Sequence, residues 1–69
     1  MRALICDLRT GRFFALDGRW TPRREEACDF GSARVASAFA VDKRFRGIEL
    51  VLTSDHSGED LRVAVPTGS

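Results

Sequence analysis

The sequence contains no tyrosine, one histidine and two cysteines in 69 residues. The two cysteines are not in a CxxC spacing, and the single histidine has no metal-binding motif around it. The chain also has no glycine-rich phosphate loop, and no Ser-His-Asp order has a supporting context. These absences argue against common catalytic and metal-binding chemistries. We therefore expect a protein that is not an enzyme and that carries no cofactor or metal.

Long hydrophobic runs are also missing. No segment approaches the ~20 apolar residues of a membrane span. The first apolar run is too short for a signal peptide, and Asp7 interrupts it. The sequence thus predicts a cytoplasmic protein without a membrane partner. In a reducing compartment, Cys6 and Cys28 are expected to be buried thiols, although a strand and a helix can also bring two cysteines within disulfide distance.

The nearly balanced charge of the chain does not indicate a strongly charged partner. The formal net charge is +1, and ten of the eleven basic residues are arginines. A strongly electrostatic nucleic-acid binder usually shows a clear basic excess, so nucleic acid is not the favoured partner. It remains the alternative, because arginine binds phosphate in a fork and aromatic residues lie nearby in the sequence. The candidate contacts are Arg9, Arg12, Arg19, Arg23 and Arg24.

Helical signals are concentrated in residues 20–45. Thr21 and Pro22 are typical of a helix start, which predicts a short helix over residues 22–28. Gly31 interrupts it, and Ser32 is suited to cap a main helix that runs from Ala33 to about residue 43. The apolar face of this helix is expected to comprise Val35, Ala36, Phe39 and Ala40.

Large aromatic residues are expected to anchor the helical region. Phe30 and Phe39 are the main candidates, with Trp20 beside them. Replacing Phe39 by alanine should cost about 3–5 kcal/mol through the cavity it leaves.

Alternating apolar and polar residues flank the helical region. They predict strands at residues 3–8, 13–16, 48–53 and 61–65, whereas residues 19–20 read either as a short extra strand or as an extended lead-in to the helix. The fold class is therefore α+β: a single domain over residues 1–66, with a flexible tail at 67–69. It contains a four-stranded, mostly antiparallel sheet in the order ββαββ, with the short and main helices on one face.

The strand pattern also predicts which residues face the helix. The inner set is expected to be Leu4, Cys6, Leu8, Ile48, Leu50, Leu52, Leu61, Val63 and Val65. The opposite face is then more apolar than a solvated face needs to be, so we expect another copy or a protein partner to cover part of it. This interpretation predicts a homodimer or partner interface through the open sheet face or an edge. Its residues would be Ile5, Val51, Ala64, and Phe14 or Phe13 according to the strand register.

The only histidine lies in a polar segment, residues 54–60, that contains three carboxylates. Turn-forming residues make a solvated hairpin loop the main interpretation. A metal or acid–base site at His56 is the minor alternative.

Several short motifs extend over most of the chain: residues 10–14, Trp20-Thr21, Glu26-Ala27 followed by Phe30 and Ser32, and residues 47–52. In this arrangement the chain resembles small bacterial ββαββ proteins of unknown function. The resemblance implies the fold and transfers no activity or functional residue.

Overall fold

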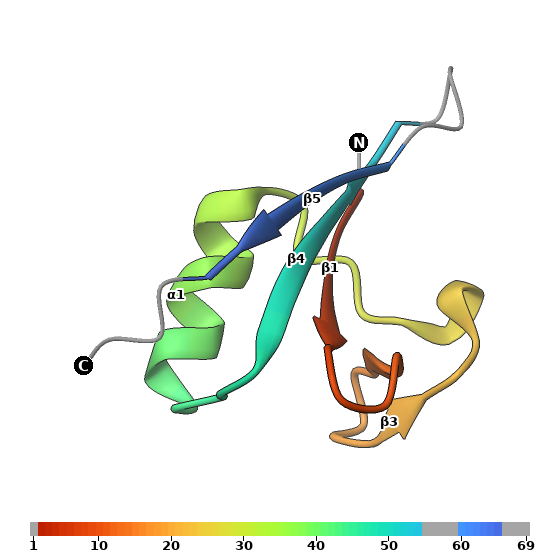
Figure 1. Ribbon diagram of the computed structural model, residues 1–69. Coiled ribbons are helices and arrows are strands. Elements are labelled where there is room, and N and C mark those ends of the chain that lie inside the picture. Colours follow the sequence, from red (N-terminus) through yellow and green to blue (C-terminus); the bar gives the residue numbers. More distant parts are fainter. Residues whose placement is uncertain (1, 55–59, 66–69) are drawn as a thin grey trace.

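A computed structural model describes residues 2–54 and 60–65 and shows an α+β fold with one five-stranded antiparallel sheet (Figure 1). The strands are β1 (Arg2–Asp7), β2 (Phe13–Phe14), β3 (Trp20–Thr21), β4 (Ile48–Thr53) and β5 (Asp60–Ala64), in the spatial order β3-β2-β1-β4-β5. The predicted class is confirmed, but the predicted count of four strands is wrong. The additional strand is β3, because Trp20 and Thr21 pair with Phe14 and Phe13.

The centre of the sheet is the antiparallel pair β1 and β4. Their ladder runs from Arg2 opposite Thr53 to Asp7 opposite Ile48. It places Ile5 opposite Leu50, so these two side chains share one face of the sheet. Both are buried in the same hydrophobic cluster as the helix residue Ala36.

This register reverses the predicted orientation of β1. Ala3 and Ile5 face the helix, whereas Leu4 and Cys6 belong to a second cluster with Val51. The prediction that Leu4 and Cys6 face the helix is therefore wrong. Residues 3–6 are all apolar and all buried, so β1 has no polar side to reveal its orientation.

Helix α1 (Ala33–Asp42) has the predicted start and bounds. The Oγ of Ser32 accepts the backbone N–H of Val35 at 3.2 Å, which caps the first turn. Ala36 and Ala40 are buried against the sheet, and their small side chains allow a close approach. Val35 instead has 52% of its surface exposed, so its predicted place on the packed face is wrong. The buried stripe is centred on the two alanines, one helical turn apart.

Aromatic side chains pack between the helix and the β2–β3 side of the sheet. The Phe14 ring lies 5.3 Å from the Phe39 ring and 5.4 Å from both Trp20 and Phe45, measured between centroids. Phe30 packs against Phe39 at 5.0 Å. The anchoring role predicted for Phe30 and Phe39 is confirmed by these contacts. Phe14, and not Phe13, is the member of the pair on the helix side.

The segment after β3 has less helix than predicted. A single turn of 3-10 helix, η1 (Arg24–Glu26), replaces the expected helix over residues 22–28. Thr21 does not serve as its N-cap; the Oγ1 of Thr21 accepts the N–H of Arg23 at 3.1 Å and donates to Glu26 at 3.0 Å. These two bonds close a compact turn in place of a longer helix.

This segment covers the face of the sheet opposite α1, so the prediction that both helices pack on one face is wrong. Ala27, just after η1, is buried in the cluster that contains Leu4, Cys6 and Val51. It bridges to Ala15, and the next residues bond to both neighbouring strands: Cys28 N–H to the Phe14 carbonyl and Phe30 N–H to the Ala3 carbonyl, each at 2.9 Å. The apolar centre of this face is therefore covered by the chain itself.

Candidate interaction surfaces

Strand β5 forms the longer edge of the sheet. It spans five residues, and all five are exposed, whereas the opposite edge strand β3 has only two residues. An edge strand presents unpaired backbone N–H and C=O groups on its outer side. Val63 lies opposite Leu50 and Leu61 opposite Leu52, so both side chains point to the helix side of the sheet.

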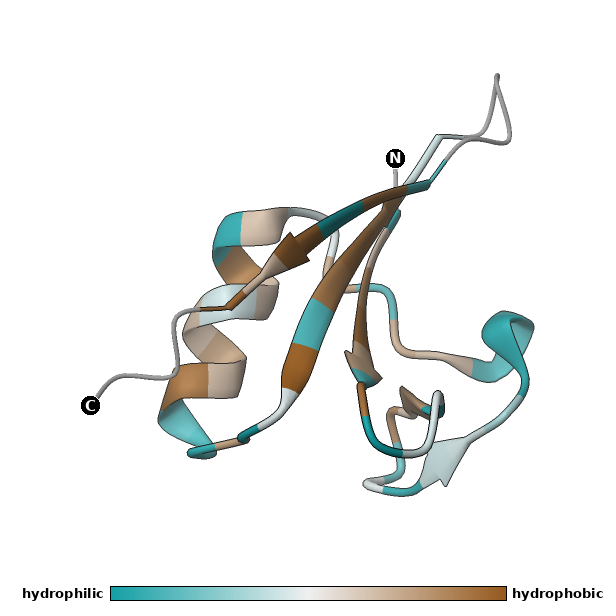
Figure 2. Ribbon diagram, in the orientation of Figure 1, coloured by the Kyte–Doolittle hydropathy of each residue, from teal (hydrophilic) through white to brown (hydrophobic). Residues whose placement is uncertain are grey.

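Helix α1 packs mainly on β1 and β4. It therefore leaves the apolar side chains of β5 largely uncovered: Leu61 is 61% exposed and Val63 is 39% exposed. Val41, near the end of α1, is 60% exposed. Figure 2 shows hydrophobic positions alternating with hydrophilic ones along β5. Among the described residues, β5 thus has no strand partner on its outer side and carries exposed apolar side chains.

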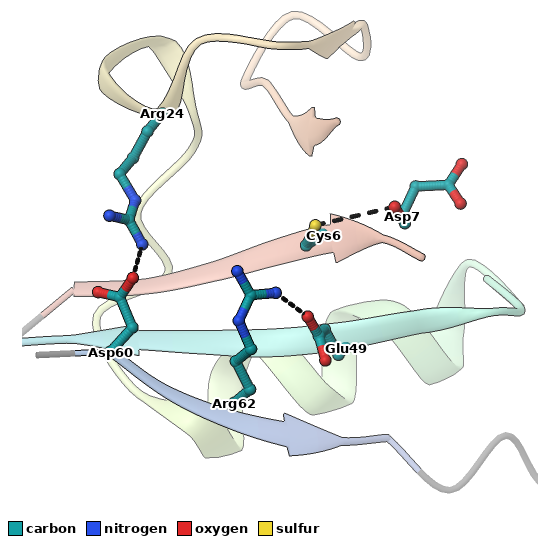
Figure 3. A network of polar contacts seen from close by, with 6 residues as sticks. All are labelled: Cys6, Asp7, Arg24, Glu49, Asp60 and Arg62. Carbon is teal, nitrogen blue, oxygen red and sulfur yellow. Dashed lines mark hydrogen bonds and ion pairs between the residues drawn. The ribbon is translucent and has the colours of Figure 1, made fainter. Parts of the chain in front are cut away.

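The other side of β5 is polar. Figure 3 shows Arg62 paired with Glu49 of β4, and Arg24 of η1 paired with Asp60. The Arg24 guanidinium also lies over the Phe13 ring, 5.9 Å from its centroid. The Arg24–Asp60 pair joins η1 to the start of β5, although these residues are 36 positions apart in the sequence. These contacts tie the covering segment to the edge strand.

Cys6 lies beside this ionic network (Figure 3), with its Sγ 3.8 Å from the Asp7 carbonyl. Burial, followed by the negative charge of Glu49, raises the pKa of the Cys6 thiol above 9.0. Burial also raises the pKa of Cys28. The two thiols are free and do not form a disulfide. Because the thiolate is the reactive form, neither cysteine is prepared as a nucleophile near neutral pH.

The predicted interface residues lie in different environments. Ile5 and Val51 have no exposed surface, and Phe14 is packed in the aromatic cluster. They offer a partner no open face because α1 and the segment around Ala27 cover the two sides of the sheet. Phe13 is half-buried, while Ala64 is exposed on β5. The prediction of an interface through the open sheet face is therefore not supported, whereas an interface through the β5 edge, which includes Ala64, has an accessible surface.

The five predicted arginine contacts do not form one uniform surface. Arg9 and Arg12 lie around the turn between β1 and β2, whereas Arg19 pairs with Asp17 at 2.6 Å and Arg24 with Asp60. Arg23 is exposed beside η1. The Leu8 N–H bonds to the Gly47 carbonyl at 2.8 Å, which brings the β1–β2 turn beside the loop after α1. Sequence reasoning missed Lys43, Arg44 and Arg46 in that loop, because their proximity depends on the pairing of β1 with β4.

A hollow of about 500 Å³ lies at the β2–β3 side. The Asp17–Arg19 ion pair and Trp20 form part of its wall. Its other lining residues are Ala15, Leu16, Thr21, Pro22 and Glu26. The mixture of one aromatic ring and a few charged groups suits binding of a polar group better than a wholly apolar ligand.

Within residues 2–54 and 60–65, no group of three His, Cys, Asp or Glu side chains is arranged to hold a metal ion. His56 and its proposed loop site, as well as the tail at 67–69, lie outside the described residues. In the described part of the chain, no helix has both the length and the apolar character needed to cross a membrane.

No family model, curated protein or solved structure matches this chain. The resemblance to small bacterial proteins therefore stays a prediction.

Proposed function

We propose that this protein is a non-enzymatic, cytoplasmic interaction module that forms a homodimer by pairing β5 with β5 of a second copy. The observation that carries the proposal is the exposure of all five β5 residues on a sheet edge, with Leu61 and Val63 outside the main cover of α1. Backbone pairing would satisfy the open edge, while contact between the copies would bury the apolar side chains.

The sequence of β5 favours one antiparallel register. A two-fold axis perpendicular to the sheet would relate the two β5 strands as an antiparallel pair. In such a pair, residues that lie directly opposite each other have side chains on the same face of the sheet. Placing Val63 on the axis sets each Val63 opposite its counterpart and Leu61 opposite Val65 of the second copy. On the other face, Arg62 then lies opposite Ala64. Placing Arg62 on the axis instead sets two arginines opposite each other, which is unfavourable.

A second copy also suits the size of the chain. A domain near 69 residues buries only about 60% of the surface that its unfolded chain exposes, and association is a common way to increase that burial. In the proposed dimer, the two five-stranded sheets become continuous and both helices lie on the same side. The Arg62–Glu49 pair remains on the opposite side, away from the apolar contact.

The test is solution mass by light scattering over a concentration series, for the native protein, Val63→Lys and Val35→Lys. Val35 is a matched control because it is also an exposed valine, but it lies on α1. The expected result is a dimer for the native protein and Val35→Lys, and a monomer with an unchanged circular dichroism spectrum for Val63→Lys. An inward-pointing lysine on an edge strand opposes strand pairing.

Two results would refute the proposal. One is a native protein that remains monomeric at the highest concentration. The other is a folded Val63→Lys protein that dimerises as strongly as Val35→Lys.

A further inference from the structure

Two basic segments that are far apart in the sequence meet at one end of the molecule. The β1–β4 ladder ends with Asp7 opposite Ile48, and the next residues remain together through the Leu8–Gly47 hydrogen bond. Figure 1 shows the β1–β2 turn and the loop after α1 at the same end of the sheet. We call this surface the basic end; it consists of Arg9, Arg12, Lys43, Arg44 and Arg46.

All five side chains of the basic end belong to exposed residues. Arg9 is the one with a nearby carboxylate, at 4.0 Å from Asp7. Asp7 is also engaged by the backbone N–H of Arg9 at 2.9 Å. The other four residues form no ion pair within residues 2–54 and 60–65. Lys43 lies with its Nζ 5.7 Å from the centroid of the Phe39 ring, and no carboxylate in these residues neutralises its charge. Figure 2 shows hydrophilic residues both at the end of α1 and at the β1–β2 turn.

Arg44 has a backbone conformation in which glycine is the usual residue. Its φ is 58°, in the left-handed region. The Phe45 N–H bonds to the Ala40 carbonyl and the Arg44 N–H to the Val41 carbonyl, each at 3.0 Å. This is the hydrogen-bond pattern of a Schellman motif, in which glycine is the usual residue at the left-handed position. An arginine there supplies charge at the expense of backbone stability.

The chemistry of the basic end fits phosphate groups. Four of its five members are arginines, whose planar guanidinium groups bind phosphate through two parallel hydrogen bonds. An aromatic ring adjoins it: Trp20 packs 5.4 Å from Phe45, which lies between Arg44 and Arg46 in the chain. Trp20 is half-buried and forms part of the wall of the hollow beside Arg19. A single strand can place a base on such a ring, whereas a duplex keeps its bases stacked internally.

We propose that the basic end binds the sugar–phosphate backbone of single-stranded nucleic acid, with Trp20 available to stack on one base. Arg9, Arg12, Lys43, Arg44 and Arg46 contact phosphates. The site is separate from the β5 edge, so it does not depend on the proposed dimer.

Binding can be measured by fluorescence anisotropy of a labelled thymidine oligonucleotide, with the unlabelled native protein, Arg44→Gly and Arg34→Ala. Arg34 is the matched control: it is an exposed arginine in the first turn of α1, at the other end of the helix. Each variant loses one positive charge. The native protein should bind at low salt, with an affinity that falls steeply as salt rises.

Arg44→Gly should weaken this binding about three- to tenfold at low salt and reduce the slope of log affinity against log salt by about 0.7. Its thermal stability should not fall, so unfolding cannot explain the loss. Arg34→Ala should retain the native affinity. Because Trp20 is the only tryptophan, quenching of intrinsic fluorescence by an unlabelled oligonucleotide reports on the proposed stacking.

The proposal would be overturned by absence of oligonucleotide binding at low salt or by equal losses of affinity in Arg44→Gly and Arg34→Ala. Equally tight binding of duplex DNA, or unchanged tryptophan emission on binding, would also overturn it. Displacement of the oligonucleotide by polyglutamate at the same charge concentration would also refute phosphate recognition, because it would assign the surface to acidic polypeptides.

Discussion

The carboxylate of Asp29 accepts the backbone N–H of Ala3, with 3.0 Å between the oxygen and the nitrogen, across 26 positions of sequence. The same oxygen accepts the N–H of Gly31 at 2.8 Å. One exposed side chain thus joins the first strand to the turn that precedes α1. Ala3 is fully buried, so its donor would be difficult to satisfy without this carboxylate.

The hydrogen bonds that Asp29 accepts should make the free energy of unfolding depend on pH. The N–H of Ala3, followed by that of Gly31, lowers the pKa of Asp29 below its ordinary value of 3.8. A lowered folded-state pKa adds stability above the unfolded pKa, and that stability is lost as pH falls through the folded pKa. Asp29→Asn should therefore lower the free energy of unfolding by about 1 kcal/mol at neutral pH, and by less at low pH.

Urea unfolding at several pH values, from neutral to below about pH 3, measures this effect. Asp42→Asn is the control, because Asp42 is an exposed carboxylate at the end of α1 for which the structure shows no hydrogen bond within the described residues. A difference between native protein and Asp29→Asn that stays constant with pH would contradict the assigned role.

The close contact between α1 and the sheet gives a second prediction. Ala36 has no exposed surface and packs in the cluster with Ala3 and Ile5. Ala36→Leu should reduce the free energy of unfolding by about 1–3 kcal/mol, because a larger side chain must push the helix from the sheet. Ala38→Leu is the matched control on the exposed side of the same helix and should change it by no more than about 0.5 kcal/mol. Chemical unfolding that finds equal stability for the two variants would refute this packing.

The end of α1 gives a third prediction. Arg44→Gly should raise the free energy of unfolding by roughly 0.5–1 kcal/mol, since glycine adopts the left-handed conformation without a Cβ clash. Lys43→Gly should lower it by about 1 kcal/mol, because Lys43 has a right-handed conformation with φ of −83°. Thermal and urea unfolding of both variants distinguish the two positions. A stability loss in Arg44→Gly equal to that in Lys43→Gly would show that the left-handed strain is absent.

Local signals predicted the main helix well. The oxygen of Ser32 and the conformational freedom of Gly31, which has φ of 82°, act within one turn of the chain. The same local reasoning failed at residues 22–28. There the hydroxyl of Thr21 closes a tight turn, and the bonds of Cys28 and Phe30 to neighbouring strands hold the following residues extended. Tertiary contacts thus override the short-range preference for helix.

The candidate sites were only partly accessible to sequence reasoning. The polar and apolar alternation of Ile48–Thr53 oriented β4 correctly, whereas the uninterrupted apolar run in β1 could not indicate a face. Ile5 and Val51 were predicted to be open to a partner, yet both are buried because the chain covers both faces of the central strands. Of the basic end, Arg9 and Arg12 were predicted as nucleic-acid contacts, whereas Lys43, Arg44 and Arg46 were not. The two segments are separated by about thirty residues and meet only through the β1–β4 ladder.

The sequence by itself determined the α+β class, the bounds of the main helix and the anchoring role of Phe30 and Phe39, because caps, glycine conformations and side-chain periodicity act over a few residues. Only the tertiary structure decided that β5 is the exposed edge, that the segment around Ala27 covers the second face, and that Arg9 lies beside the loop of Arg44 and Arg46. These features depend on strand order and register, which are set by the simultaneous packing of segments distant in the chain.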